Sequence, residues 1–443
     1  MAASTHRPGG LLRILKNAGW IGMLTPLDVI FGLARTAMLA RMLGADGFGL
    51  LSTLLATVQL CDGALRLNSA ETVMSFVSAR LADEDVEGAS ALSGYCYLTD
   101  ALTSLLAVAA VLAVAWGLGH WFGVPRSAAP MLSIFGVSIF LRATSIDSRA
   151  LVRLADRYRW EFFLLAGVGL FTTCGIGAIF FSGSNSLMAV IWVMTIVAAG
   201  EGLVGLMLGQ RAMTILGFRQ RPRLTLSIGA DGAKIRRFQL TSSVRMMVKS
   251  VSKNADILLI GALAKPHDVG IYRAAKQLSG LLRAAAASAV TAIYPEYSRL
   301  YHRGDLLALR RLVLRLLLAF SLLGLVSAAL ITLLIDPIVY IALGPEFVAA
   351  KQVILILLLS VLLLVAVTPL YSLPAAAGHA GPALAALLFG AGAQAVCMVL
   401  LVPRIGAQGA AWSMMAFSVA WIATLLPGVL RILRTKGNAE TVQ

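Results

Sequence analysis

Charged residues are scarce in this chain. Asp, Glu, Lys and Arg make up 13% of its 443 residues, whereas 59% of the residues are hydrophobic. Soluble globular proteins carry about 25% charged residues, so this composition excludes an ordinary soluble enzyme or binding module. The mean hydropathy of +0.85 indicates instead a protein embedded in a membrane.

Cysteine and histidine are also rare, with four and five residues. The cysteines stand singly on apolar stretches and the histidines form no HExxH pattern, so we expect neither a disulfide framework nor a metal site. There is no P-loop. One GxGxxG match, at 200–205, lies inside an apolar run, where glycines favour helix packing over dinucleotide binding. We therefore predict no cofactor, no catalytic residue and no enzymatic activity.

Long apolar runs are abundant. A helix needs about 20 apolar residues to cross the hydrocarbon core of a membrane, and a lipid-exposed backbone must satisfy its own hydrogen bonds. The runs do not alternate as transmembrane strands do, so an all-α membrane protein is predicted. We expect twelve spans, at residues 14–38, 48–66, 91–116, 128–147, 160–181, 187–208, 240–263, 270–293, 311–334, 350–373, 382–402 and 409–432.

Basic residues predict the orientation. With the N-terminus inside, 24 Lys and Arg residues fall on the cytoplasmic side and 5 on the opposite side. Cytoplasmic loops are enriched in Lys and Arg, so both termini are expected to be cytoplasmic. The net charge of +16 is then explained by topology and contact with anionic lipids. No nucleic-acid partner is predicted.

The chain also divides into two halves of six spans. We predict an N-terminal lobe at 1–209, a basic cytoplasmic connector at 210–237 and a C-terminal lobe at 238–443. A short internal similarity, between residues 46–51 and 268–272, favours a repeat. Repeats of this kind place the substrate site of many transporters between the halves.

Several charges lie inside the predicted spans. A charge at the centre of a membrane helix costs roughly 2.5 to 3.5 kcal/mol, so such residues face a protein interior or a wet cavity. Eight of them are basic and five are acidic, which predicts a cationic cavity suited to an anionic head group. We predict that four of the deeper basic residues bind the substrate: Arg35, Lys249, Lys276 and Arg283.

Other charged residues have a second interpretation. Asp28 and Asp256 could couple an ion or pair with the cavity cations. Arg66, Arg245 and Arg273 lie near span ends, where pairing within the protein or snorkelling explains them.

Four segments resemble a known family. They are Ala40–Leu50 after the first span, Asp256–Tyr272 followed by Ala274-Ala275, Pro295 at the end of span eight, and Gly406–Trp412 at the start of span twelve. In this order and spacing, the chain is identified as a member of the multidrug/oligosaccharidyl-lipid/polysaccharide exporter superfamily. It is most similar to the polysaccharide transporter branch, the flippases of O-antigen and exopolysaccharide biosynthesis.

The resemblance implies a fold and an activity. The expected fold has two pseudo-symmetric six-helix lobes in a V shape around a central cavity. The expected activity is transfer of a polyprenyl-pyrophosphate-linked oligosaccharide across the bacterial inner membrane by alternating access. Implied partners are the lipid-linked oligosaccharide, the bilayer, a polysaccharide polymerase and a chain-length regulator, and the protein is expected to be a monomer. The resemblance transfers no site residue.

Two alternatives stay open at this stage. A drug/cation antiporter of the same superfamily would need a net acidic cavity. A membrane-embedded glycan polymerase or ligase would be expected to carry a large outward loop. The glycan, the surface polymer and the energy source leave no readable pattern in the sequence.

Overall fold

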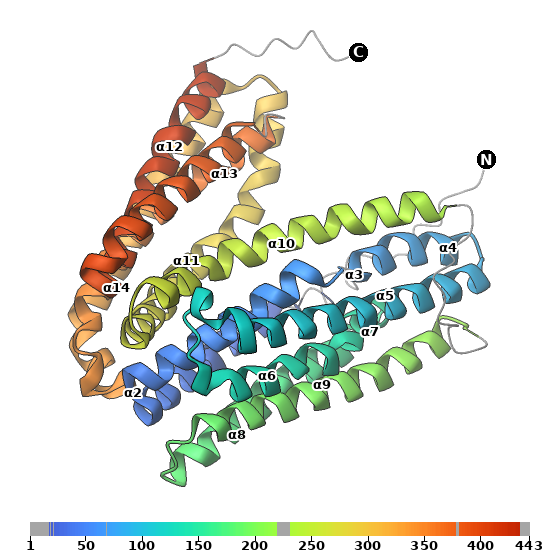
Figure 1. The fold of residues 1–443 in the computed structure, drawn as a ribbon. Helices are drawn as coiled ribbons and strands as arrows, with labels where there is room; N and C mark the ends of the chain where they lie inside the picture. Colours follow the sequence, from blue (N-terminus) through green and yellow to red (C-terminus); the bar gives the residue numbers. More distant parts are fainter. Residues whose placement is uncertain are drawn as a thin grey trace. The chain divides into compact units, whose positions relative to one another are not determined.

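The computed structural model describes residues 17, 19, 20, 22–67, 69–218, 231–377 and 381–434. Within these ranges every regular element is a helix (Figure 1), which confirms the predicted all-α class. The first residues of the first predicted span and positions 219–230 of the predicted connector lie outside the described ranges. Contacts group the chain into two compact units, which we describe one at a time.

Unit 1 contains the described residues up to Leu43 and residues Thr53–Leu258. Helix α10 belongs to it as far as Leu258. Its elements are most of α2 (Leu24–Leu65), α3 (Ser69–Thr72), the π-helical turn η1 (Val73–Val77), α4 (Ser78–Ala82), α5 (Val86–Ala113), η2 (Val114–Leu118), η3 (Gly119–Phe122), η4 (Arg126–Ala128), α6 (Ala129–Leu141), α7 (Ala143–Leu154), α8 (Tyr158–Phe181), α9 (Leu187–Ile215) and most of α10 (Gly232–Leu263).

Unit 2 contains Gly44–Ser52, a short piece of α2, and the described residues from Leu259 onward. Its further elements are α11 (Pro266–His302), α12 (Leu306–Pro337), η5 (Ile338–Leu343), η6 (Pro345–Phe347), α13 (Ala350–Ala376) and α14 (Gly381–Arg434).

The helices account for the twelve predicted passes. In the described part of the chain, eight helical segments are long and apolar enough to cross a membrane. Two of these, α2 and α14, are each a pair of helices joined at a kink. The remaining two passes are α10 and α11, which carry several of the in-span charges and are too polar to be recognised by hydropathy alone. Many apolar side chains of the other helices are exposed, as expected where a helix faces lipid.

Both kinks fall at a glycine. Gly44 has φ 65° and ψ −176°, and Gly406 has φ 54° and ψ −130°. A positive φ is strained for residues with a Cβ atom, so only glycine takes these positions readily. The two sites share the pattern Gly-Ala-x-Gly, at 44–47 and at 406–409. The sequence predicted loops here; the structure has abrupt bends that join two spans directly.

Each kink frees backbone N–H groups, and a carboxylate accepts one of them in both cases. The N–H of Ala45 donates to Oε2 of Glu346 at 3.1 Å. The N–H of Ala407 donates to Oδ1 of Asp268 at 2.9 Å. Acidic groups stabilise the N-terminus of a helix through its unpaired N–H groups and its dipole. The two bends are therefore built and capped in the same way.

The piece of α2 in unit 2 crosses the start of α11 at very short range. A Cβ atom on Gly49 would collide with the carbonyl of Pro266, and one on Gly270 would collide with the carbonyl of Ala45. Phe48 packs edge-on against Phe347, with ring centroids 6.2 Å apart. Small residues allow this close helix approach, which explains why Gly44–Ser52 groups with unit 2.

Glycines of α9 play a similar part in unit 1. A Cβ atom on Gly202 would meet the carbonyl of Leu141, and Cβ atoms on Gly205 and Gly209 would meet Ser145 and Ser148 of α7. The GxGxxG match is thus a helix-packing surface, which confirms the interpretation made from its apolar context.

One helix continues beyond its predicted span. Span eight was expected to close at Pro295, but α11 continues to His302. Proline within a helix removes one backbone donor and favours a bend, yet it does not have to end the helix.

Candidate functional site

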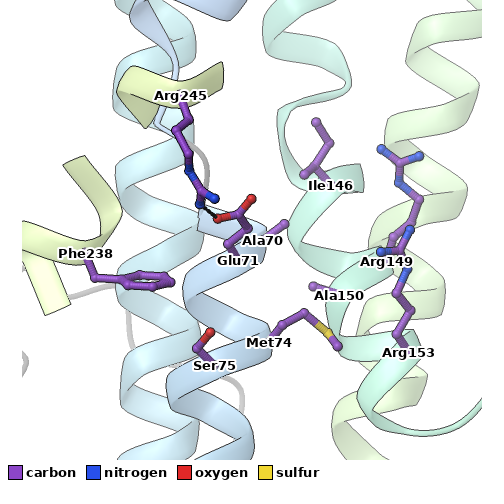
Figure 2. Close-up of a pocket in the computed structure, with 10 residues that line it drawn as sticks. All are labelled: Ala70, Glu71, Met74, Ser75, Ile146, Arg149, Ala150, Arg153, Phe238 and Arg245. Carbon is purple, nitrogen blue, oxygen red and sulfur yellow. Dashed lines mark hydrogen bonds and ion pairs between the residues drawn. The ribbon is translucent and has the colours of Figure 1, made fainter. Parts of the chain in front are cut away.

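A polar cavity of about 380 Å³ opens within unit 1 (Figure 2). Four elements line it: α3, η1, α7 and α10. The lining residues are Ala70, Glu71, Met74, Ser75, Ile146, Arg149, Ala150, Arg153, Phe238 and Arg245. Three guanidinium groups and one carboxylate therefore face the same space, which gives the lining a positive net charge.

Helical spacing explains two of the arginines. Arg149 and Arg153 are four residues apart on α7, so they share one helix face. Figure 2 shows them across the cavity from Phe238 and Arg245, which come from α10. Met74 and Ser75 of the π-helical turn η1 also line the cavity. Turns of this type are frequent at functional sites because they displace side chains from the regular helical register.

The three arginines have different partners. Arg153 forms a bidentate pair with Glu161 of α8, through N–O distances of 2.7 and 2.6 Å. Arg245 pairs with the cavity carboxylate of Glu71. Arg149 lies in the field of Glu201 and Glu161, but its buried Nε atom has no hydrogen-bond partner among the described residues. Of the three lining arginines, Arg149 is thus the one without a carboxylate ion pair among the described residues.

Helix α10 is held on unit 1 by polar contacts. Nε2 of Gln239 donates to the Ser69 hydroxyl at 2.6 Å, and the Tyr95 hydroxyl donates to Oε1 of Gln239 at 3.1 Å. The Ser250 hydroxyl donates to the carbonyl of Gln59 at 2.9 Å. Such interhelical hydrogen bonds replace the hydrophobic driving force that helices lack inside a membrane.

The structure places the predicted cations of unit 1 in different surroundings. Arg35 is half-buried on α2. The charge of Asp28, an exposed residue on the same helix, attracts it. Lys249 is exposed on α10. Asp256 is 6% exposed, and its Oδ1 accepts the N–H of Ile257 at 2.9 Å. Two of the charged residues of α10 therefore differ in surroundings, with Lys249 exposed and Asp256 buried.

The other two predicted residues belong to unit 2. Lys276 is half-buried on α11, and its Nζ lies 6.0 Å from the centroid of the Tyr272 ring. The side chain of Arg283 lies outside the described residues. None of the other five predicted site residues lines the cavity of unit 1.

Sequence reasoning assigned the cavity arginines to other roles. The orientation predicted from the sequence places Arg149 and Arg153 among the 24 cytoplasmic charges, and Arg245 is expected to pair within the protein or to snorkel. The pairing of Arg245 is confirmed by its contact with Glu71. The signal that could have found the site is the face shared by Arg149 and Arg153 next to a run of buried polar residues in α7.

The arrangement is suited to an anionic group. Planar guanidinium groups recognise phosphate and carboxylate oxygens through paired N–H donors. The cavity is lined by polar, aromatic and apolar groups together, and its arginines come from two separate helices. It lies at the end of unit 1 where the sequence predicts the cytoplasmic side.

The twelve helical passes define a multi-pass membrane protein, and its fold is similar to that of solved transporters. The chain is similar to an inward-facing multidrug resistance MATE family transporter of the MOP superfamily, with a TM-score of 0.68, 14% identity and coverage of 91% of this chain and 94% of the other. It is equally similar to the lipid II flippase MurJ in an inward closed conformation, with a TM-score of 0.68, 12% identity and coverage of 93% and 88%.

A third likeness is to a MOP superfamily transporter from Pyrococcus furiosus, whose binding pocket is described as reversed in polarity. Here the TM-score is 0.61, the identity 12% and the coverage 96% of both chains. A search of curated protein sequences finds no match. The model of the polysaccharide biosynthesis protein family matches residues 14–301. The chain therefore belongs to the polysaccharide biosynthesis protein family, with the fold of MOP superfamily transporters, as the sequence resemblance predicted.

Proposed function

We propose that the protein is a flippase that moves a polyprenyl-pyrophosphate-linked oligosaccharide from the cytoplasmic to the outer leaflet of the bacterial inner membrane. The product would serve cell-surface polysaccharide biosynthesis, such as that of O-antigen, lipopolysaccharide or exopolysaccharide. Alternating access between the two halves of the chain moves the head group, while the polyprenyl tail stays in lipid. Both termini are cytoplasmic in this proposal.

The observation that carries the proposal is the sign of the charge in the unit 1 cavity. Arg149, Arg153 and Arg245 face it with Glu71 as the single lining carboxylate. A pyrophosphate that leaves water loses its hydration, and charged donors must replace it. We assign Arg149 as the first contact of the pyrophosphate because the other two lining arginines already pair with carboxylates, Arg153 with Glu161 and Arg245 with Glu71.

Family and fold support the same substrate class. The family is one of polysaccharide biosynthesis proteins, and a similar structure is that of a lipid II flippase. Arg35, Lys249, Lys276 and Arg283 stay our candidates for later contacts along the path, with Asp28 and Asp256 as ion-coupling or pairing groups. A polysaccharide polymerase and a chain-length regulator are proposed partners.

The drug/cation antiporter alternative fits this cavity poorly. A cationic substrate would need a net negative site, and the cavity of unit 1 has the opposite sign. The polymerase or ligase alternative needs groups that react with a sugar. We assign it no residues.

Binding of inorganic pyrophosphate to the purified protein in nanodiscs tests the assignment. Hydrogen bonds to charged groups contribute about 1.5 to 3 kcal/mol each, so Arg149→Gln is expected to weaken binding by roughly 10- to 100-fold. Arg237→Gln is the matched control, because Arg237 is exposed on α10 and does not line the cavity. Equal binding by wild type and Arg149→Gln would contradict the assignment of this cavity to the transport path.

A further inference from the structure

Two carboxyl groups lie deep inside unit 1, away from the arginine cavity. Asp100 of α5 is 1% exposed and Asp147 of α7 is fully buried. Their side chains interact directly with each other. Asp147 was not recognised from the sequence as an in-span charge because it falls at the last position of the predicted fourth span.

The pair has too few hydrogen-bond donors. The Ser69 hydroxyl donates to Oδ1 of Asp100. Oδ2 of Asp100 and both carboxyl oxygens of Asp147 are buried without a hydrogen-bond partner among the described residues. Ionised carboxylates only accept hydrogen bonds, so two of them cannot bond to each other. A single proton between them would supply the missing donor.

The charges around the pair lead to the same conclusion. Arg66 of α2 attracts both carboxyl groups. It also pairs with Asp62 at 2.9 Å, and Asp62 lies 3.5 Å from Arg142. Three acids and two arginines leave one negative charge in excess, and an unbalanced buried charge is costly. One bound proton makes the group neutral.

The remaining titratable groups near the pair do not change this balance. Arg149 of α7 and Glu201 of α9 attract each other and add one charge of each sign. The thiol of Cys96 and the hydroxyl of Tyr97 come from α5, and both feel the charge of Asp147. Both are neutral groups at physiological pH. From α3 and α10 the nearest polar groups of the network are uncharged, namely the Ser69 hydroxyl and the Gln239 amide.

We propose that Asp100 and Asp147 share one proton and form a proton-binding site inside unit 1. The site is connected to α10 through hydrogen bonds. Asp100 accepts from Ser69, and Ser69 accepts from Gln239 of α10 at 2.6 Å. Loss of the proton places a new negative charge at one end of this chain, so the proton state is linked to the contact that holds α10 on the unit.

Infrared spectroscopy of the protein in nanodiscs tests the proposal without any substrate. A protonated carboxyl group has a C=O stretching band that is separate from that of a carboxylate. We expect wild type to show this band at neutral pH from one buried carboxyl group, with a small shift in heavy water. Asp100→Asn and Asp147→Asn are each expected to lose the band, because the remaining acids then match the two arginines.

The control is Glu296→Gln, which removes an exposed carboxylate of unit 2 and is expected to leave the band unchanged. Wild type itself provides the test if a variant fails to fold, because raising the pH must remove its band. The proposal is wrong if folded wild type has no such band at neutral pH, or if the band persists in both Asn variants. A wild-type protein that lacks the band but is stabilised by sodium ions would show that a metal cation occupies the site instead. Failure here leaves the flippase assignment intact, because no step of the measurement uses the lipid-linked substrate.

Discussion

The backbone N–H of Ala45 donates to the carboxylate of Glu346 at 3.1 Å, although 301 residues separate the two in sequence. This contact caps the second half of α2 directly after the Gly44 kink. A helix cap of this kind contributes about 1 kcal/mol, and the loss of 1 kcal/mol lowers the melting temperature of a 150- to 250-residue unit by about 2–4 °C.

We therefore expect Glu346→Ala to lower the melting temperature by about 2–4 °C. Asp46→Ala is the control, since Asp46 lies on the same turn and its side chain is 78% exposed. Thermal unfolding of the protein in detergent, followed by circular dichroism, measures both. Equal melting temperatures for Glu346→Ala and wild type would mean that the cap contributes no stability.

The glycine crossing between α2 and α11 predicts a larger effect. Gly270→Ala places a methyl group against the carbonyl of Ala45, and the two backbones must separate to accept it. Overpacking of this type costs roughly 1 to 3 kcal/mol. Gly280→Ala, on the same helix, has open space around its Cβ position and is expected to be neutral or slightly stabilising. Similar unfolding curves for the two variants would contradict the close crossing.

Variants of the Arg153–Glu161 pair test how much this ion pair contributes to stability. Glu161 is 1% exposed, so Arg153→Ala leaves a buried charge without its partner and is expected to cost about 3 kcal/mol of stability. The double variant Arg153→Ala/Glu161→Gln removes the unpaired charge and should recover most of that loss. Chemical denaturation measures the free energy of unfolding of both variants. If the double variant is no more stable than Arg153→Ala, the pair is not the source of the effect.

Some features of the fold could be predicted from the sequence, and others could not. Apolar runs correctly indicated the helices, because spanning length and backbone satisfaction leave few alternatives. Gly44 and Gly406 were interpreted as loop residues, since a glycine's positive φ cannot be distinguished from a loop without its capping partner. Glu346 and Asp268 provide those caps from distant positions, and nothing local in the sequence indicates this.

The candidate site was less predictable for a related reason. Arginine near the end of a span has the same sequence pattern whether it sets topology or lines a cavity. Arg149 differs from Arg153 in having no carboxylate ion pair among the described residues. Such a property depends on the packing of α7 against α3 and α9. Arg66, in contrast, was expected to pair within the protein or to snorkel, and its ion pair with Asp62 at 2.9 Å confirms the pairing.

The membrane potential offers a direction for transport. Moving one negative charge out of a negative cytoplasm is favourable by about 2.3 kcal/mol per 100 mV. We expect collapse of the potential to slow net flipping in proteoliposomes that contain a fluorescent lipid-linked oligosaccharide. An unchanged rate would exclude the potential as the drive and leave ion coupling, for which Asp28, Asp256 and the Asp100–Asp147 pair are the candidates.

The most direct test of the flippase assignment is the leaflet in which lipid-linked oligosaccharide accumulates when the gene is deleted. An impermeant lectin or glycosidase reports the leaflet, and plasmids carrying wild type, Arg149→Gln, Arg35→Ala, Lys249→Ala or the control Arg237→Gln test complementation. Our account predicts that the intermediate accumulates on the cytoplasmic face, and that wild type and Arg237→Gln restore export whereas Arg149→Gln fails at normal membrane levels. Intermediates that already face outward in the deletion strain would contradict the account, because translocation would then occur without this protein.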